Sequence, residues 1–560
     1  MPSKQKMPST VKDILNYDLT LADTVRAFTG AYYTPLSIAQ TMIEDAVCFY
    51  LQNLGYKCAD VDDFMAAKAS ALAAEILDLL SRAKLIDMAS GTGVFGFAWL
   101  STLDKLHRQY KLVSTDQYLQ RAMRGIVLND CNAASVEQFS ALLKRQFGLD
   151  FKGTILSVDA LCELAMQPAV KKVVDDGGFD IVIGNPPYIG ERGHTDLFAP
   201  LKDDAKWSKY YMGKMDYSYF FVHQGLDFLS KNGVMTQIMT SYFMTADGAQ
   251  KLRQDLQQRA TWQGIRYYDK LDEFHAVKNL SFVIFSVTQK RDADVICRIQ
   301  RNAKRFSASN RELYSAVGHI QLIPPADNEL LSRIEQRARY KLTDLCHVNQ
   351  GLVSGADRLK RKHCKMLNIP YEGERPIFVF KADECGEDEQ LKPFLKNSDI
   401  GSYQLAKAPT QRILYSVADN LRNRPQWLEH LAPYRAILSR RREVKAGVRK
   451  WYELQWPRAE SIFLAKKIVA PQRASRNCFA YVETPVYGSA DIYFITLKHS
   501  LPYAEVDEAA LLKALTMYLN SSVVYLWLNY KGKRKGAQFE LYASPLRQIP
   551  VPAFSAQHVD

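Results

Sequence analysis

The sequence predicts an α/β fold whose first part is a Rossmann-like, mostly parallel doubly wound sheet and whose second part is a mixed α+β domain. From about residue 29 to residue 290, helical segments alternate with short, continuously apolar runs, as a buried parallel sheet requires. After residue 290 this alternation ends. A chain of 560 residues also exceeds what one hydrophobic core usually supports. We therefore expect two domains, residues 1–295 and 296–560.

The elements follow in order along the chain. The expected strands are residues 84–88, 125–129, 153–158, 179–184, 233–240, 264–268 and 282–287. The expected helices include residues 37–54, 94–108, 135–147, 217–230 and 249–259. Residues 291–340 are expected to form a helical connector, and the rest of the chain to mix short strands, helices and loops. Ligands of a doubly wound sheet bind at the carboxyl ends of its strands, so the residues just after each strand are the candidates for function.

The net charge of +13 is unevenly distributed. Residues 291–560 hold 42 Lys and Arg against 28 Asp and Glu, whereas residues 1–290 hold 31 against 32. A near-neutral part joined to a basic part favours chemistry in the first and a polyanionic partner for the second. A basic half that only aids solubility remains the alternative.

The nine cysteines are scattered and form no Cys-x-x-Cys pair, which argues against a disulfide framework and a structural zinc site. Cys346-His347 and His363-Cys364 do not change this, because adjacent side chains rarely converge on one ion. We expect no metal. No apolar run reaches the roughly 18 to 20 residues that span a bilayer, and the first residues contain no signal-type apolar core. We expect a cytoplasmic protein.

The first expected strand leads into a glycine-containing turn. Asp87 ends the strand, and Gly91 and Gly93 allow the backbone to turn tightly and approach a ligand closely. An acidic residue here can accept hydrogen bonds from a positively charged or hydroxylated ligand but repels phosphate, and the spacing matches no phosphate-binding loop. A turn with a purely structural role would have the same pattern.

Two more strands also end at an aspartate. Asp130 follows the second strand, where it could bind ribose hydroxyls. Asp159 follows the third strand, where its carboxylate could accept a hydrogen bond from an adenine amine. One aspartate after a strand is common in loops, but three in succession indicate a binding site.

The fourth strand leads into Asn185-Pro186-Pro187-Tyr188. The prolines restrict the backbone and predict a rigid loop at the edge of the sheet. The Asn185 side-chain oxygen and a proline carbonyl could accept both protons of an NH2 group, which draws the nitrogen lone pair out of ring conjugation. Tyr188 offers a flat face for stacking the ring that bears the amine.

These motifs, in this order, resemble the gamma-class adenine-N6 DNA methyltransferases of the TaqI-like or Eco57I-like group, over residues 30–551. The resemblance implies a class I methyltransferase domain that uses S-adenosyl-L-methionine. It implies catalysis by Asn185, Pro186, Pro187 and Tyr188. Met88 and Ser90 depart from the common form of the methionine-binding motif. The implied cofactor-binding residues are Tyr32, Tyr33, Thr34, Pro35, Asp87, Ala89, Gly91, Gly93, Asp130, Asp159 and Asn185.

The resemblance also implies a second aromatic residue beside the extruded base, and Phe274 is the candidate. A buried core phenylalanine is the alternative interpretation. Residues 348–357, 391–400, 467–471 and 519–522 resemble the family's C-terminal target recognition domain. Basic clusters interleaved with aromatic residues and glycines there are typical of contacts to phosphates and base edges. The candidate DNA-binding residues are Arg441, Lys445, Arg449, Lys450, Arg473, Arg476, Lys533, Arg534 and Lys535.

The implied function is site-specific transfer of a methyl group to the N6 amine of an adenine flipped out of double-stranded DNA. The enzyme would act as a solitary, monomeric methylase or with a separately encoded restriction endonuclease. One alternative is methylation of a protein glutamine amide or of RNA, against which the basic second half argues. A fused restriction enzyme is disfavoured because only about 30 residues precede the first motif and no nuclease pattern is evident. A DNA-binding protein with an inactive methylase fold is disfavoured by the intact catalytic loop.

Overall fold

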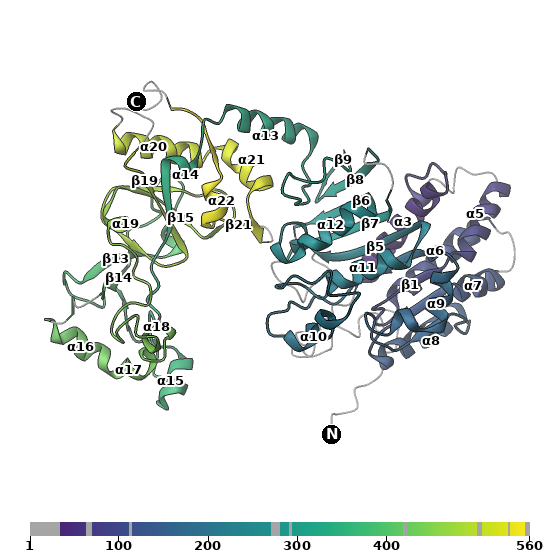
Figure 1. Ribbon diagram of the computed structural model, residues 1–560, viewed down its shortest axis with the longest axis horizontal. Helices are drawn as coiled ribbons and strands as arrows, with labels where there is room; N and C mark the ends of the chain where they lie inside the picture. Colours follow the sequence, from purple (N-terminus) through teal and green to yellow (C-terminus); the bar gives the residue numbers. More distant parts are fainter. Residues whose placement is uncertain are drawn as a thin grey trace. The chain divides into compact units, whose positions relative to one another are not determined.

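The computed structural model describes residues 34–62, 70–110, 115–269, 280–290, 294–417, 420–421, 423–500, 507–535 and 538–554. The chain divides into two compact units, Met1–Pro325 and Ala326–Asp560 (Figure 1). Each has its own hydrophobic core, as two domains of this size require.

A nine-stranded sheet forms the centre of the first unit, in the order β3-β2-β1-β4-β5-β7-β6-β8-β9. The neighbours from β3 to β5 pair in parallel, and β7 runs antiparallel between β5 and β6. The sheet is therefore mostly parallel, as expected. Its strands are β1 Leu85–Asp87, β2 Ile126–Asn129, β3 Thr154–Leu156, β4 Phe179–Gly184, β5 Leu229–Thr240, β6 Ala260–Tyr268, β7 Phe282–Gln289, β8 Ile296–Arg301 and β9 Lys304–Ser309.

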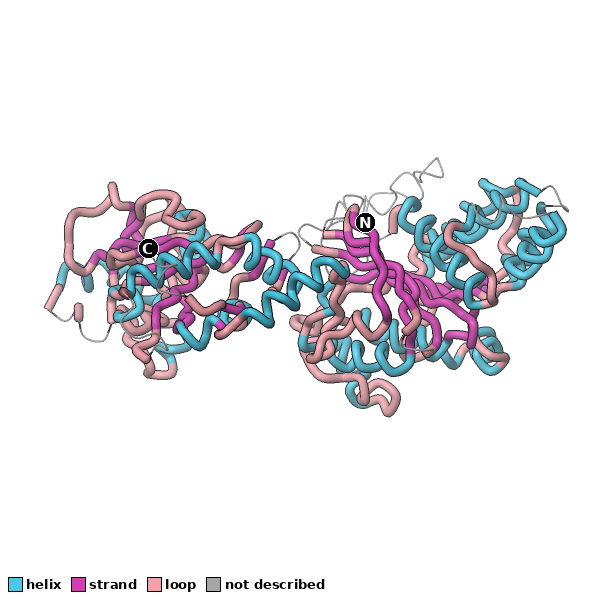
Figure 2. Tube along the Cα trace, turned by 90° about the horizontal axis from the view of Figure 1, so that it is seen from above, coloured by secondary structure: helices cyan, strands magenta, loops and turns pink. Residues whose placement is uncertain are grey.

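Helices cover both faces of this sheet (Figure 2). Alternate strand residues point to opposite faces, so Leu85, Ile181 and Ile183 join one core while Ile86 and Val182 join the other. The first core is completed by α3 Leu36–Asn53, α5 Ser70–Arg82, α6 Val94–Tyr110, α7 Thr115–Arg124 and α8 Ala133–Phe147. The second is completed by α9 Pro168–Asp175, α10 Thr195–Asp203, α11 Ser218–Phe228 and α12 Gln250–Arg259. This is a doubly wound arrangement, which confirms the predicted fold class.

The prediction of a helical connector at residues 291–340 is wrong for much of this segment. β8 and β9 form an antiparallel hairpin, and β8 adds to the sheet in parallel beside β6. Cys297 and Ile299 are buried while the residues between and around them face away, a period of two that favours a strand. Only α13 Pro325–Arg337 is helical in the described part of this segment. The compact unit consequently extends beyond the expected boundary at residue 295.

The second unit mixes small sheets with short helices around one core. Its sheets have the orders β11-β19-β15-β17, β12-β14-β13-β18, β16-β21-β20 and β10-β22. The strands are β10 Tyr340–Lys341, β11 Cys346–Gln350, β12 Val379–Lys381, β13 Leu391–Leu395, β14 Gln411–Leu414, β15 Lys467–Pro471, β16 Arg473–Ala474, β17 Ala480–Val482, β18 Tyr487–Gly488, β19 Ile492–Leu497, β20 Arg534–Lys535, β21 Gln538–Glu540 and β22 Pro550–Val551. The helices are α14 Leu342–Leu345, α15 Arg361–Leu367, α16 Pro425–Leu431, α17 Arg435–Leu438, α18 Arg442–Lys445, α19 Ser461–Leu464, α20 Glu508–Leu519, α21 Ser522–Lys531 and α22 Ala543–Arg547.

Among the described residues, no single helix is both long and apolar enough to cross a membrane. The sharply bent pair α20 and α21 meets the length and composition criteria only when its two helices are taken together.

Candidate active site

The carboxyl end of β1 holds a completely buried carboxylate. Asp87 Oδ1 accepts a hydrogen bond from the Ala89 backbone N–H at 3.2 Å, and the residue has no exposed surface. Its Oδ2 is buried without a hydrogen-bond partner among the described residues. Burial raises the pKa of Asp87 well above its ordinary value, and the nearby Asp130 adds to that rise. An acceptor of this kind favours a cationic ligand group.

The turn after β1 is held against the end of β2. The Gly91 backbone N–H donates to Asp130 Oδ2 at 2.8 Å, and Asp130 Oδ1 accepts from the Asn132 N–H at 2.9 Å. Gly91 and Gly93 have φ of 51° and 78°, and a Cβ on Gly93 would lie 2.5 Å from the Phe139 ring. Both glycines are therefore needed for this backbone path. Each Asp130 oxygen keeps a second lone pair for a ligand hydroxyl.

Asn129, which the sequence analysis did not single out, joins three strand ends. Its side-chain amide donates to the carbonyls of Met88 and Val158 at 3.1 Å each, and its Oδ1 accepts from the Val158 N–H at 3.2 Å. An asparagine that is fully buried at the end of an apolar strand was the available signal. Asp159 follows, and its Oδ1 accepts backbone N–H groups of Leu161 at 2.8 Å and of Cys162 at 2.7 Å.

The carboxyl end of β4 places Asn185 between two hydroxyl groups. Asn185 Nδ2 donates to Thr34 Oγ1 at 3.1 Å, and Asn185 Oδ1 accepts from the Tyr188 hydroxyl. Thr34 is buried and Pro35 immediately precedes α3. Both contacts hold the Asn185 carboxamide in place at the carboxyl end of β4. The expected N-terminal motif and the expected catalytic loop therefore meet in space at Thr34 and Asn185.

Tyr188 is also tied to β5. Its hydroxyl shares its proton between Asn185 Oδ1 and the carbonyl oxygen of Ile238, which lies 2.8 Å away. The half-buried ring packs between the two cores, 6.1 Å from the Phe282 ring centroid. Burial, with a contribution from Asp216, raises the pKa of Tyr188 well above its ordinary value, so the hydroxyl stays protonated.

Three predicted residues lie outside the described residues, namely Tyr32, Tyr33 and Phe274. Of the other predicted site residues in the first unit, Gly91 and Asp130 link the ends of β1 and β2, and Asn185 and Thr34 link the end of β4 to the start of α3. Asp87 contacts the backbone of its own turn at Ala89. Within the described residues, no group of three or more His, Cys, Asp or Glu side chains is arranged to hold a metal ion.

Comparison with known proteins shows what the chain is similar to. The family model of the Eco57I restriction-modification methylases matches residues 104–274, a range that includes Asp130, Asp159 and the loop from Asn185 to Tyr188. The expected resemblance to methyltransferases of restriction-modification systems is thereby confirmed.

Two curated relatives match about two thirds of the chain. The Type II methyltransferase M.HindII of Haemophilus influenzae (strain ATCC 51907 / DSM 11121 / KW20 / Rd) is 26% identical over 420 residues, covering 67% of this chain and 75% of the relative. The Type II methyltransferase M.HincII of Haemophilus influenzae is 24% identical over 399 residues, covering 67% and 74%. Among solved structures, the Type IIL restriction-modification enzyme MmeI in complex with DNA has a TM-score of 0.61 at 13% identity, covering 97% of this chain and 71% of that one. This last likeness shows the fold alone.

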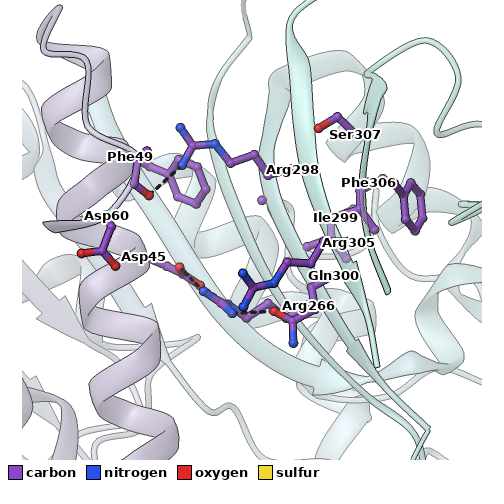
Figure 3. Close-up of a pocket in the computed structure, with 13 residues that line it drawn as sticks. Asp45, Phe49, Asp60, Arg266, Arg298, Ile299, Gln300, Arg305, Phe306 and Ser307 are labelled. Carbon is purple, nitrogen blue, oxygen red and sulfur yellow. Dashed lines mark hydrogen bonds and ion pairs between the residues drawn. The ribbon is translucent and has the colours of Figure 1, made fainter. Parts of the chain in front are cut away.

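A pocket of about 540 Å³ in the first unit is lined by none of these motif residues (Figure 3). It lies between α3 and the strands β6, β8 and β9. Arg266 forms two hydrogen bonds to Asp45, at 2.6 and 2.7 Å, and Arg298 donates to the carbonyls of Cys58 and Ala59 at 3.2 and 3.1 Å. These two arginines hold α3 and the segment after it against the sheet.

The predicted DNA-binding residues fall into two groups in the second unit. Arg441 is engaged internally: it donates to the carbonyls of Leu438, Ser354 and Trp451 at 2.9, 3.1 and 2.7 Å. Burial lowers its pKa to about 10, so it stays charged at neutral pH. The structure gives this guanidinium a structural role rather than a position open to DNA.

The remaining cations are more accessible. Arg473 is exposed and forms an ion pair with Glu540 at 3.5 Å, whereas Arg534 donates to Asn529. Arg449 is partly exposed, and the side chain of Lys535 lies outside what the structure describes. The other exposed members of the set are Lys445, Lys450, Arg476 and Lys533.

Proposed function

We propose that this methylase transfers a methyl group from S-adenosyl-L-methionine to the N6 amine of an adenine in double-stranded DNA. The observation that carries the proposal is the carboxamide of Asn185, oriented by Thr34 and Tyr188 at the carboxyl edge of the sheet. Asp87 is the last residue of β1, and Asp130 and Asp159 follow β2 and β3 of that sheet. A catalytic acceptor thus lies at the same edge as a set of acidic binding residues.

The residues present fit this cofactor. The Asp87 oxygen that lacks a partner among the described residues suits the ammonium of the methionine part, and the positive φ of Gly91 and Gly93 gives the turn beside it its tight path. Asp130 would hold the ribose hydroxyls and Asp159 the adenine amine. Ala89 and Pro35 would line the site, together with Tyr32 and Tyr33. When bound, S-adenosyl-L-methionine supplies an electrophilic methyl group.

The Asn185 loop fits a planar amine. A carboxamide oxygen has two lone pairs, so Asn185 Oδ1 could accept a proton of the substrate NH2 group as well as the hydrogen bond from the Tyr188 hydroxyl. The Pro186 carbonyl would accept the other proton, and Pro187 would hold the loop rigid. Catalysis would then rest on positioning and on acceptors placed where positive charge develops on the nitrogen.

The substrate adenine would have to leave the duplex stack to reach Asn185, which costs a few kcal/mol. Tyr188 would stack on the extruded base, with Phe274 as the second aromatic. The basic second half, the DNA complex of the structurally similar MmeI, and the kinship with Type II methyltransferases all support DNA as the substrate. The enzyme would act alone or beside a separately encoded endonuclease, as a monomer in the cytoplasm.

The test is to incubate the purified protein with methyl-labelled S-adenosyl-L-methionine and, separately, with duplex DNA, RNA and protein. Label should enter duplex DNA, and digestion to nucleosides should yield N6-methyldeoxyadenosine. Label in RNA or protein, or on cytosine, would contradict the assignment. Sequencing the modified DNA would then give the recognition site.

A further inference from the structure

The second unit contains a pocket of about 300 Å³ that the proposed chemistry leaves unexplained. Three segments far apart in sequence build it: the loop at Tyr403, the loop at Arg476 and Asn477, and the junction of α20 and α21 at Asn520. Its volume lies at the lower end of the range of about 300 to 1,000 Å³ seen for small-ligand pockets. The pocket is therefore large enough for one nucleotide unit.

Two asparagines lock these segments together. Asn477, which is buried, donates to the carbonyls of Leu519 and Ser521 at 2.8 and 3.0 Å. Asn520 donates to the Phe479 carbonyl at 2.7 Å and accepts from the Phe479 N–H at 3.0 Å. The frame of the pocket is thus held by four side-chain hydrogen bonds to the backbone, one of them buried and the others partly buried. A site built in this way is pre-formed and loses little entropy when it binds a ligand.

Tyr403 is held in a backbone conformation that a bulky residue rarely adopts, with φ of 73°. Its N–H donates to the Phe479 carbonyl at 2.8 Å, and its carbonyl accepts from the Tyr481 N–H at 3.0 Å. The side chain is nevertheless 46% exposed. Strain of this kind is retained mostly at functional sites, and here it presents an aromatic ring to solvent at the pocket.

A second tyrosine lines the same pocket. Tyr525 is 41% exposed, and its ring packs edge-on against Phe539 with the centroids 5.5 Å apart. The pocket thus has two accessible aromatic side chains, and one of them is braced by a neighbouring ring. Such rings suit contact with the flat face of a base or with a sugar.

Arg476 is the one charged residue among those that line the pocket, all of which the structure describes. It is exposed, and its guanidinium makes no hydrogen bond or ion pair with any described residue. The nearby Arg473, by contrast, is paired with Glu540. A guanidinium without a carboxylate partner, beside hydroxyls such as that of Ser522, suits a phosphate.

We propose that this pocket binds the backbone of the DNA substrate, with Arg476 on one phosphate and Tyr403 and Tyr525 against the adjoining nucleotide. This inference rests on the proposed function, because it needs DNA as the substrate. Arg476 supplies affinity that does not depend on sequence. The two tyrosines fix the position of the DNA on the second unit.

The first experiment measures DNA binding by the full chain over a range of salt concentrations, for wild type, Arg476→Ala and the control Lys365→Ala. Lys365 is an exposed cation on α15 that does not line the pocket. Arg476→Ala should weaken binding to specific and to unrelated duplexes alike, by about three- to tenfold, and reduce the slope of log Kd against log salt by about 1. The control should change neither quantity by as much.

An unchanged salt slope in Arg476→Ala would overturn the proposal, and so would a loss confined to the specific duplex, which would indicate base reading. Thermal melting checks that the variant is folded. If wild type methylates DNA and Arg476→Ala binds it normally, the pocket proposal fails while the proposed function stands. If wild type neither binds nor methylates DNA, both fail.

The second experiment replaces Tyr403 by asparagine, which tolerates a positive φ and so preserves the loop while removing the ring. Tyr403→Asn should raise KM for DNA by about tenfold, the scale of one lost stacking contact, with kcat and cofactor affinity nearly unchanged. Tyr403→Phe, which keeps the ring, should restore the wild-type KM. An unchanged KM in Tyr403→Asn would overturn the stacking role.

Discussion

The acidic residues at the strand ends of the first unit and the basic residues of the second unit differ in how their charged groups are engaged. In the first unit, buried carboxylates accept hydrogen bonds from the backbone and still have acceptor capacity towards the site, as Asp87 and Asp130 show. In the second unit, Arg441 uses its donors on three backbone carbonyls while its neighbour Lys445 is exposed. The position of a residue at a strand end therefore indicates its role more reliably than the sign of its charge.

The largest effect should come from removing the acceptor at the centre of the first site. Asn185→Ala should lower kcat for methyl transfer by about 10²- to 10³-fold, because an oriented acceptor for the developing charge is lost. Binding of DNA and of cofactor should persist. Single-turnover methylation assays combined with binding titrations measure both.

Thr34→Ser is the matched control, since it keeps the hydroxyl that accepts from Asn185 Nδ2. It should retain most of the activity. Wild-type turnover in Asn185→Ala would remove this residue from the mechanism.

The second effect concerns Asp87. Asp87→Asn should weaken binding of S-adenosyl-L-methionine by roughly 10- to 100-fold, because a charge-assisted contact to the ammonium is lost. In the wild type, burial raises the pKa of Asp87, and a bound cation favours the ionised form. Binding at low pH must then release a proton, so affinity should rise with pH, by at most about tenfold per pH unit, until Asp87 is ionised in the free protein.

Calorimetric titration of the cofactor at several pH values measures this dependence. Asp87→Asn should flatten it, whereas Asp116→Asn, a change at an exposed aspartate of α7, should not. A cofactor affinity that is insensitive to pH in the wild type would contradict the direct contact.

The third effect separates structure from binding in the second unit. Arg441→Ala leaves the carbonyls of Leu438, Ser354 and Trp451 without their donor, and should lower the free energy of unfolding by about 1 to 3 kcal/mol. Urea denaturation measures this change. Loss of DNA affinity at unchanged stability would instead assign Arg441 to the DNA surface.

The smallest effect is expected at Lys445. Lys445→Ala should leave unfolding unchanged and weaken DNA binding by about two- to threefold at moderate salt, as the loss of one screened phosphate contact does. Comparing its salt slope with that of wild type checks the assignment. If Lys445→Ala lost as much stability as Arg441→Ala, the distinction between internally bonded and exposed cations would be wrong.

The sequence by itself predicted the seven strands of the methylase sheet up to β7, because a strand covered on both faces must be continuously apolar. It also predicted the strand-end positions of Asp87, Asp130, Asp159 and Asn185, since parallel strands share one carboxyl edge. It missed the hairpin of β8 and β9, whose alternation is short and whose exposed positions include both apolar and charged residues, such as Ile296 and Arg298.

Only the tertiary structure decided which polar groups form hydrogen bonds with one another. The contact of Thr34 with Asn185 joins residues 151 positions apart, and that of Tyr188 with Ile238 joins residues 50 apart. The sequence could not show that Arg441 donates hydrogen bonds to backbone carbonyls while Arg476 is exposed, because both are arginines in basic segments. Burial and hydrogen-bond partners depend on how distant segments pack, and a local sequence pattern does not contain that information.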